Sequence, residues 1–186
     1  MDYTIKNYFD SDECSDIIKY CMDNGELFSY NPNENWDCRR IHTNEFKEKI
    51  LFRFKELHIN SDTSYWFNFD KSNVENVNIS LTRYYNGRFL NLHKDTKSQF
   101  TTVIVLTNQF EDGRFVLSNM VGNDIKDMRD DSTKINLELG QGISFDGGNV
   151  LHGVMPVYSG IRCALNIWMV DSDYNYSKFK NTKTLL

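Results

Sequence analysis

The sequence lacks any long hydrophobic run, and this absence bounds where the protein is expected to work. No apolar stretch approaches the roughly 20 residues of a transmembrane helix, and the mean hydropathy is −0.55. The first residues, MDYTIKNYF, lack the basic and then apolar layout of a signal peptide. We therefore expect no association with a membrane and a cytoplasmic location.

Paired cysteine motifs are also missing. The four cysteines lie far apart and form no CxxC pair: Cys14, Cys21, Cys38 and Cys163. In a chain without a secretory signal, isolated cysteines are typical of reduced thiols. Cys14 and Cys21 are seven residues apart, which places both on one face of a helix as small core residues.

An excess of basic residues is the third absence. The chain has 21 Lys and Arg against 26 Asp and Glu, a net charge of −5 at pH 7. An acidic protein without a basic cluster is a poor binder of nucleic acid, so that class of partner is disfavoured. The 186 residues contain no internal repeat and no low-complexity segment. This length predicts one domain, 1–186, rather than two.

The first part of the chain has the periodicity of helices after an initial strand. Residues 3–9 predict the strand, and Asp10 with Glu13 has the spacing of a capping box. Apolar residues then recur at helical spacing until Gly25, and a second apolar stripe begins after Thr43. We expect helices within residues 10–58 that support the rest of the fold.

Between these helices, residues 29–43 are polar and rich in turn-forming residues. They predict either a plain surface loop or a loop that covers a site. The segment contains Trp36 and Arg40, which could stack on a bound peptide and form hydrogen bonds with its backbone. We therefore consider both residues as candidate substrate contacts.

From Val77 onward the hydrophobic period shortens to that of strands, with glycines between the runs. The predicted strands are 77–85, 101–106, 114–117, 135–139, 143–145, 150–154 and 161–170. Many short strands with regular turns favour a β-sandwich or barrel, with the two helices packed outside one sheet. The predicted fold is mainly β (α+β), with its β core at about residues 77–170.

The stretch from Val150 to Trp168 combines a histidine, a turn and an arginine. His152 precedes the turn at Gly160, and Arg162 shares one face of the returning strand with Asn166 and Trp168. A buried arginine requires a planar acceptor that accepts two hydrogen bonds, usually a carboxylate. Either the chain or a ligand must therefore supply an acid beside Arg162.

A second stretch, LTRYYNGRFLNLHKDTK, contains His93 and Asp95, whose side chains share one face of an extended chain. A His-x-Asp pair alone is weak support for a metal site, because a lone histidine on a strand is more often a core residue. The conjunction with His152 is stronger, since two histidines and one carboxylate form the facial triad of non-haem Fe(II) oxygenases. Tyr84 lies nine residues before His93 and could donate a hydrogen bond to a co-substrate.

Taken together, these segments resemble the 2-oxoglutarate/Fe(II)-dependent dioxygenases, in particular the prolyl 4-hydroxylase-like branch. The resemblance rests on RYYNGRFLNLHKD, LTNQFEDGRFVL and LELGQGISFDGGNVLHGVMPVYSGIRCALNIW, and extends to the opening YTIKNYFDSDECSDIIKY. It therefore spans nearly the whole chain. Three positions depart from the pattern: Asp112 replaces the first of two paired glycines, Arg162 stands where collagen-type members have lysine, and Leu90 replaces an aromatic residue.

The resemblance implies a double-stranded β-helix (jelly roll) with N-terminal helices packed on the larger sheet. It also implies Fe(II) bound by His93, Asp95 and His152, and 2-oxoglutarate bound through its distal carboxylate by Arg162 and Tyr84. O2 would be the other co-substrate, with ascorbate as an optional addition. Asn166 and Trp168, on the same face as Arg162, join Trp36 and Arg40 as candidate substrate residues.

The implied reaction is hydroxylation of an unactivated C–H bond, with a prolyl residue of a peptide or protein as the leading substrate. Hydroxylation of a free amino acid or another small molecule is the alternative within the same class. A jelly roll that binds a metal or a sugar without catalysis is the alternative from another class. That protein would have no need for Arg162 and Tyr84 on the metal side.

Overall fold

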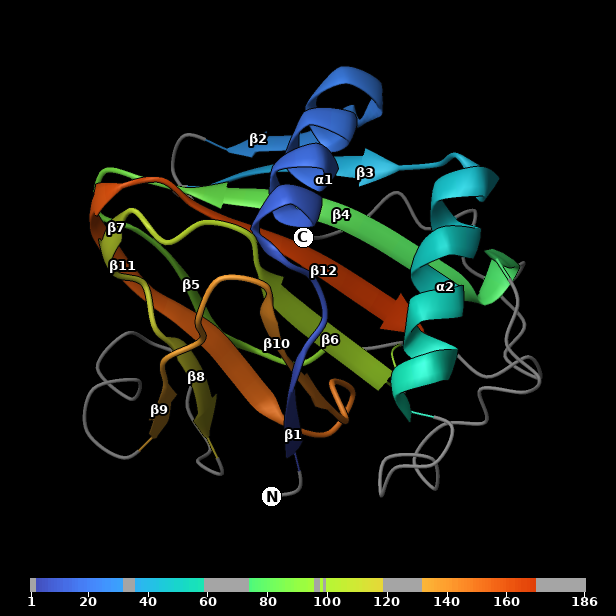
Figure 1. Cartoon of the computed structure of the whole chain (residues 1–186). Helices are drawn as coiled ribbons and strands as arrows, with labels where there is room; N and C mark the ends of the chain where they lie inside the picture. The colour runs from blue at the N-terminus through green and yellow to red at the C-terminus, as the bar shows by residue number, and fades with distance from the viewer. Residues whose placement is uncertain are drawn as a thin grey trace.

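Two antiparallel sheets form the frame of the molecule, with both helices beside the larger one (Figure 1). The structure is a computed structural model. It describes residues 3–31, 36–58, 74–95, 98, 100–118 and 132–169.

Within these ranges the larger sheet has seven strands. Their order across the sheet is β1 (Tyr3–Asn7), β10 (Gln141–Phe145), β6 (Phe100–Val105), β12 (Arg162–Met169), β4 (Val77–Tyr84), β3 (Trp36–Ile41) and β2 (Glu26–Asn31). A short 3-10 helix, Val74–Asn76, leads into β4.

The smaller sheet is ordered β5 (Arg88–His93), β11 (Leu151–Gly160), β8 (Phe115–Ser118) and β9 (Thr133–Ile135), and β7 (Phe110–Asp112) also pairs with β11. From β4 to β12 the chain passes back and forth between the two sheets. This alternation is consistent with a jelly roll. The predicted strands all lie within a few residues of observed ones, whereas β5 and β7 had not been delimited from the sequence.

Two buried clusters lie on the two faces of the larger sheet. One combines side chains of both helices with alternate residues of the sheet, such as Ile79, Leu165 and Ile167. The other lies between the two sheets and includes Ala164 of β12 and Phe115 of β8. The alternation read from the returning strand is confirmed, because odd-numbered residues of β12 belong to the first cluster and Ala164 to the second.

Helix α1 (Ser11–Asn24) begins with the predicted capping box. The Asp10 carboxylate accepts hydrogen bonds from the backbone amides of Asp12 and Glu13, and the Glu13 carboxylate accepts one from the Asp10 amide. The helix ends at Gly25, where a Cβ would lie only 2.4 Å from the carbonyl oxygen of Cys21. The second predicted helix is α2 (Asn44–His58).

The prediction of a loop at residues 29–43 is wrong for 29–31 and 36–41, and residues 32–35 lie outside the described residues. Most of this segment forms β2 and β3, which extend the larger sheet beyond β4. The polar composition suggested exposure, but the polar side chain of Asp37 on β3 is buried because Arg83 on the neighbouring strand β4 binds it. Its buried carboxylate accepts hydrogen bonds from Nε and Nη2 of Arg83 at 2.9 and 2.8 Å.

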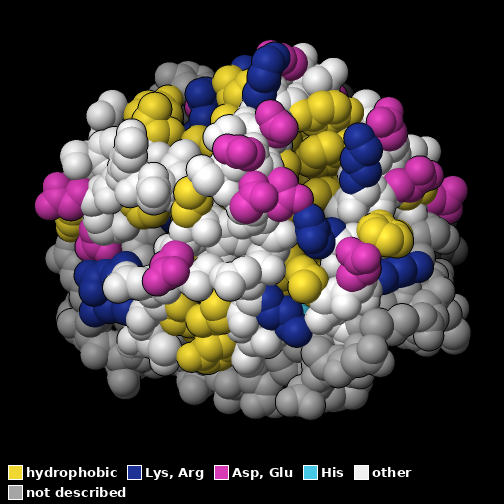
Figure 2. All heavy atoms as spheres, viewed as in Figure 1, with side chains coloured by type: hydrophobic (Ala, Val, Ile, Leu, Met, Phe, Trp, Pro, Cys, Tyr) yellow, Lys and Arg dark blue, Asp and Glu magenta, His cyan; other side chains and the backbone are white. Residues whose placement is uncertain are grey.

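Neither described helix is both long and apolar enough to cross a membrane. All four cysteines are free and buried. Figure 2 shows acidic and basic side chains mixed over the face that carries the helices.

A buried polar group joins α2 to the larger sheet. His58, at the end of α2, has no exposed surface, and its Nε2 lies 2.6 Å from the Tyr8 hydroxyl. Tyr8 in turn lies 2.7 Å from the Ser144 hydroxyl on β10. Burial, with a smaller contribution from Lys6, lowers the pKa of His58 to about 3.

Because its folded pKa lies below the ordinary value of 6.5, the unfolded chain binds this proton more readily. The contribution of His58 to stability is therefore complete above about pH 6.5 and is lost as the pH falls toward 3. The loss amounts to at most about 1.4 kcal/mol per pH unit. We expect His58→Gln to flatten the acid side of the pH dependence of urea unfolding. The exposed His42→Gln is the matched control, and an equal effect of both variants would contradict this prediction.

Candidate metal centre

Strand pairing brings the two predicted metal-binding histidines together. His93 is the last residue of β5, and His152 is the second residue of β11. The register of these antiparallel strands places them directly opposite each other. Residues that pair directly in this way project from the same face of the sheet. Their ring centroids are accordingly only 4.3 Å apart.

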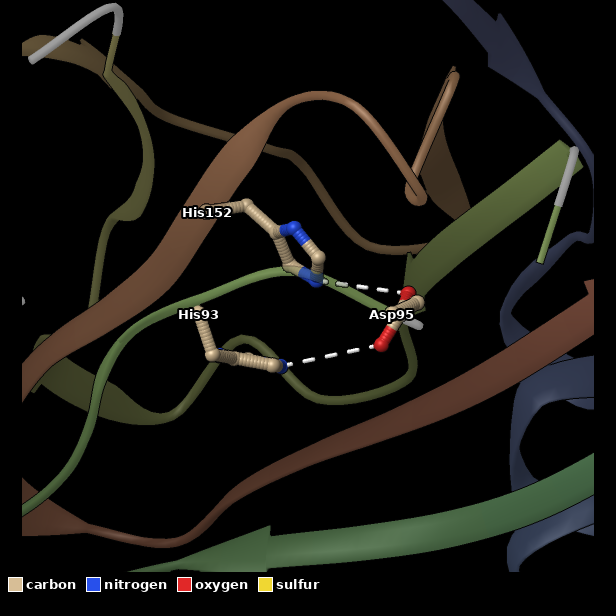
Figure 3. A group of neighbouring side chains, drawn as sticks. All are labelled: His93, Asp95 and His152. Carbon is tan, nitrogen blue, oxygen red and sulfur yellow. Dashed lines mark ion pairs between the residues drawn. The ribbon is translucent and has the colours of Figure 1, made fainter. Parts of the chain in front are cut away.

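Asp95 completes a cluster with the two imidazole rings (Figure 3). Its Oδ1 lies 3.7 Å from Nε2 of His93, and its Oδ2 lies 3.4 Å from Nε2 of His152. One ligand atom from each residue lies within 4.8 Å of the others. The three side chains can therefore reach one shared metal ion.

Backbone carbonyl groups orient both rings for this purpose. Nδ1 of His93 lies 2.9 Å from the carbonyl oxygen of Asn91, and Nδ1 of His152 lies 2.9 Å from that of Val150. A carbonyl oxygen only accepts, so Nδ1 carries the hydrogen in both rings. The lone pair is then on Nε2, the atom that faces Asp95.

Asp95 is held by two residues that sequence reasoning did not assign to the site, Thr101 and Gly147. The Thr101 hydroxyl donates to Asp95 Oδ2 at 2.8 Å, and the Asp95 amide donates to the carbonyl oxygen of Gly147 at 2.8 Å. A Cβ on Gly147 would lie 2.0 Å from Thr101 Oγ1 and 2.7 Å from Asp95 Oδ2. Gly147 is one of several glycines between strands, and no local pattern distinguishes it from the others.

The electrostatic surroundings favour the protonation states that a metal requires. Burial and the neighbouring His152 lower the pKa of His93, so its ring is neutral at pH 7. Burial alone would raise the pKa of Asp95, but His152, His93 and the Thr101 hydroxyl together bring it below its usual value. A neutral imidazole and an ionised carboxylate are the forms that bind metal.

Arg162 and Tyr84 are also brought together by register, on β12 and β4. Arg162 is 1% exposed, and its Nη1 and Nη2 are buried without a hydrogen-bond partner. No described residue supplies a carboxylate to this guanidinium. Burial lowers the pKa of Arg162, as expected for a cation removed from water.

Tyr84 is buried beside this cation, with its ring centroid 5.6 Å from the Arg162 guanidinium carbon. Burial raises the pKa of Tyr84 to about 12, although Arg162 opposes this effect. The phenol therefore keeps its proton at neutral pH and can donate a hydrogen bond.

A cavity of about 140 Å³ adjoins Arg162. Its walls combine apolar side chains with a short polar turn and include Val105, Phe110, Asp112, Gly113, Arg114, Phe115, Ile135, Asn136 and Leu137. A cavity that combines apolar side chains with a fully buried cation is suited to a small acid that has methylene groups.

By strand register, Arg40, Asn166 and Trp168 fall on the same face of the larger sheet as Arg162. Trp168 pairs directly with Thr101, the residue that holds Asp95. Asn166 lies two residues away, and its Nδ2 donates to the Thr82 hydroxyl at 3.0 Å. Both are therefore on the strand that leads from Arg162 to the cluster.

Arg40 and Trp36 lie further out, on β3. In register, Arg40 pairs with Ser80 and Trp36 with Tyr84. Ser80 pairs in turn with Asn166, so one row of residues runs from β12 to Arg40. The hydroxyl of Ser80 is buried without a hydrogen-bond partner. Sequence reasoning missed Ser80 because a serine within a strand gives no signal of its own.

Comparison with known proteins gives matches in structure but not in sequence. No family model matches the chain, and no curated protein matches it. A prolyl-4-hydroxylase from Pseudomonas putida is similar with a TM-score of 0.61 and 14% identity, over 91% of this chain and 92% of that one.

Two further similar structures were determined with bound molecules. HygX from Streptomyces hygroscopicus, with nickel and 2-oxoglutarate bound, has a TM-score of 0.66 at 10% identity, over 93% of this chain and 84% of that one. A prolyl hydroxylase from Trichoplax adhaerens, in complex with a hypoxia inducible factor peptide fragment, has a TM-score of 0.55 at 16% identity, over 91% and 83%. At these identities the likeness shows that the chain has the fold of these oxygenases.

Proposed function

We propose that this chain is an Fe(II)- and 2-oxoglutarate-dependent dioxygenase of the prolyl 4-hydroxylase-like branch. One observation carries the proposal. A cluster of two histidines and one aspartate lies in the same β core as a buried guanidinium whose Nη1 and Nη2 have no hydrogen-bond partner among the described residues. The first is the ligand set of non-haem Fe(II) sites, and the second is an unfilled receptor for a carboxylate.

In this proposal His93, Asp95 and His152 hold the iron. The donor set fits, because both Nε2 atoms and the Asp95 carboxylate are available on one side of the cluster. When bound, Fe(II) with 2-oxoglutarate and O2 supplies the oxidising power to hydroxylate an unactivated C–H bond, and 2-oxoglutarate leaves as succinate and CO2. Ascorbate is an optional addition.

Arg162 binds the distal carboxylate of 2-oxoglutarate through its two free Nη groups, and Tyr84 donates a further hydrogen bond. Such a fork-like contact is strong in a buried site because water does not compete for the donors. The apolar cluster between the sheets excludes water from the space between Arg162 and the iron ligands. The chain thereby orients the co-substrate and keeps its surroundings dry.

The substrate that we propose is a prolyl residue in a peptide or protein. The similar structures include prolyl hydroxylases, one of them with a peptide bound. The row from Asn166 through Ser80 to Arg40 gives this chain polar groups along several strands of one sheet face. Arg40 is partly exposed at the outer end of this row, and Ser80 and Asn166 are buried at its inner end. An extended peptide can reach inward from Arg40 along the row, whereas a free amino acid can contact only a short part of it.

Peptides are therefore expected to couple to the reaction better than free proline does. We expect Pro-containing peptides to raise succinate production from 2-oxoglutarate well above the background without substrate, and free proline to raise it far less. Mass spectrometry should show one added oxygen atom on the peptide.

Two arginine variants sharpen this test. Arg40→Ala should weaken the use of peptides without changing the binding of iron or 2-oxoglutarate. Arg53→Ala is the matched control, because Arg53 lies on α2 and pairs with Glu13 on α1. Efficient coupling with free amino acids, and none with a broad set of Pro-containing peptides, would favour a small-molecule hydroxylase instead.

A further inference from the structure

The turn between β7 and β8 packs directly on Arg162. Its residues Asp112 and Gly113 have φ angles of +61° and +67°, so both are in the left-handed region. The amide of Gly113 donates to the carbonyl oxygen of Pro156 at 3.1 Å, which fixes the turn to β11. Two consecutive residues in this region are uncommon unless the surroundings hold them there.

The space beside Gly113 is already filled by the side chain of Arg162. A Cβ on Gly113 would lie 2.9 Å from Cδ of Arg162 and 2.7 Å from Cγ2 of Val157. Both distances are shorter than any ordinary contact, so a larger residue must displace something. Val157 is fully buried in the cluster between the sheets, which makes it difficult to move. Arg162 is also buried, but its side chain is long and lines the cavity, so it is the group with room to shift.

The position of the Arg162 guanidinium depends on this contact because no hydrogen bond to a described residue fixes its Nη groups. Its Nη1 and Nη2 have no partner, and Gly113 and Arg162 line the same cavity. A long side chain without polar anchors is located by the atoms that pack on its methylene groups. Gly113 provides this packing surface at Cδ, next to the guanidinium.

An ion pair holds the turn in its shape. Asp112 Oδ1 accepts a hydrogen bond from Arg114 Nε at 2.8 Å, and Oδ2 accepts one from Nη2 at 3.1 Å. This pairing gives a reason for an aspartate in a left-handed conformation, which glycine would adopt more easily. The Asp112–Arg114 pair thus acts as a clamp on the turn that contains Gly113.

We propose that Gly113 is a positioning residue that sets the place of the Arg162 guanidinium and thereby determines selectivity for a keto acid with a distal carboxylate. This inference rests on the proposed function, in which Arg162 receives that carboxylate. Any residue larger than glycine at position 113 moves the guanidinium away from its ligand and leaves the metal cluster unchanged.

The test compares two acids that differ only at their far end. 2-Oxoglutarate has a distal carboxylate, and 2-oxovalerate has a methyl group in its place. Calorimetric titration of the Mn(II)-loaded protein without O2 measures the affinity of both. We expect Gly113→Ala to weaken 2-oxoglutarate binding by about tenfold or more, because small misplacements of a binding group have large effects. The affinities for 2-oxovalerate and for Mn(II) should change by less than about twofold.

Gly142→Ala is the matched control. A Cβ there would be equally crowded, at 2.7 Å from Ile104 Cγ1 and 2.8 Å from Tyr8 Cε2. It lies on the helix side of the larger sheet, so it should lower the melting temperature without changing the ratio of the two affinities.

If Gly113→Ala does not fold, a second variant tests the same turn without changing Gly113. Asp112→Asn combined with Arg114→Gln removes the clamp, keeps the net charge of the cavity wall and retains a residue that tolerates the left-handed region. This double variant should lower the affinity for 2-oxoglutarate relative to that for 2-oxovalerate. Equal loss of both acids, or an unchanged ratio in the variants, would overturn the inference and leave the proposed function standing. A wild-type protein that does not distinguish the two acids would overturn both.

Discussion

Replacement of Asp95 by alanine is expected to abolish succinate formation and to weaken metal binding by more than about 100-fold. Losing a residue that merely supports a metal ligand costs about 10–100-fold, and Asp95 would be a ligand itself. Its two oxygens face the two imidazole rings. Among the described residues it is the one acidic member of the cluster, so its loss removes the negative charge that would offset that of the metal ion. His93→Ala and His152→Ala should have comparable effects.

The fold should survive these substitutions. Each residue lies at the end of a strand or in a connection whose backbone hydrogen bonds do not depend on the side chain, as the Asp95 amide shows by donating to Gly147. Circular dichroism and calorimetric titration with Mn(II) would separate loss of metal from loss of structure. Asp146→Asn is a suitable control, because Asp146 precedes Gly147, which binds the Asp95 amide, but the Asp146 carboxylate accepts a hydrogen bond from Asn149. Wild-type metal occupancy and turnover in all three alanine variants would show that the assignment is wrong.

Removal of the Arg162 guanidinium is expected to change binding and stability in opposite directions. In Arg162→Met, the distal carboxylate of 2-oxoglutarate would enter a buried site without its partner, a loss of about 2–5 kcal/mol in binding free energy. That loss corresponds to roughly thirtyfold to several thousandfold in affinity. Arg162→Lys should be milder, since it keeps the charge but loses the planar fork.

The same Arg162→Met variant should be more stable than the wild type when no ligand is bound. The guanidinium is 1% exposed and both its Nη groups lack partners, so burying it costs free energy that an apolar side chain of similar length does not incur. We expect the melting temperature of the ligand-free protein to rise and the shift caused by 2-oxoglutarate to disappear. Equal 2-oxoglutarate affinity in Arg162→Met and wild type would rule out the proposed role of Arg162. A fall in melting temperature without ligand would contradict the reasoning about its burial.

The proposed iron ligands and Arg162 are separate parts of one candidate site. Arg162→Met should leave Mn(II) binding unchanged, because Arg162 is on β12 whereas the histidines are on β5 and β11. Asp95→Ala should weaken 2-oxoglutarate as well as metal, because the proposed co-substrate binds at both ends. This asymmetry between the two variants is measurable by the same titrations.

Local patterns determined several features of this protein. The capping box at Asp10 and Glu13 specified where α1 begins, because its hydrogen bonds join residues three positions apart. Alternation along β12 placed Arg162 on the opposite face from Leu165, because the side-chain period of a strand is two. The His-x-Asp spacing kept His93 and Asp95 within reach of each other because Asp95 follows the last residue of β5 by only two positions.

Only the tertiary structure decided which distant segments meet. The pairing of His93 with His152, and of Tyr84 with Arg162, is a matter of strand register, which no local spacing encodes. The same is true of β3, whose Asp37 becomes buried only because β4 supplies Arg83 as its partner. Sequence patterns report interactions between near neighbours. The crowding that requires glycine at Gly147 and Gly113 arises from side chains of other strands, so it became visible only in three dimensions.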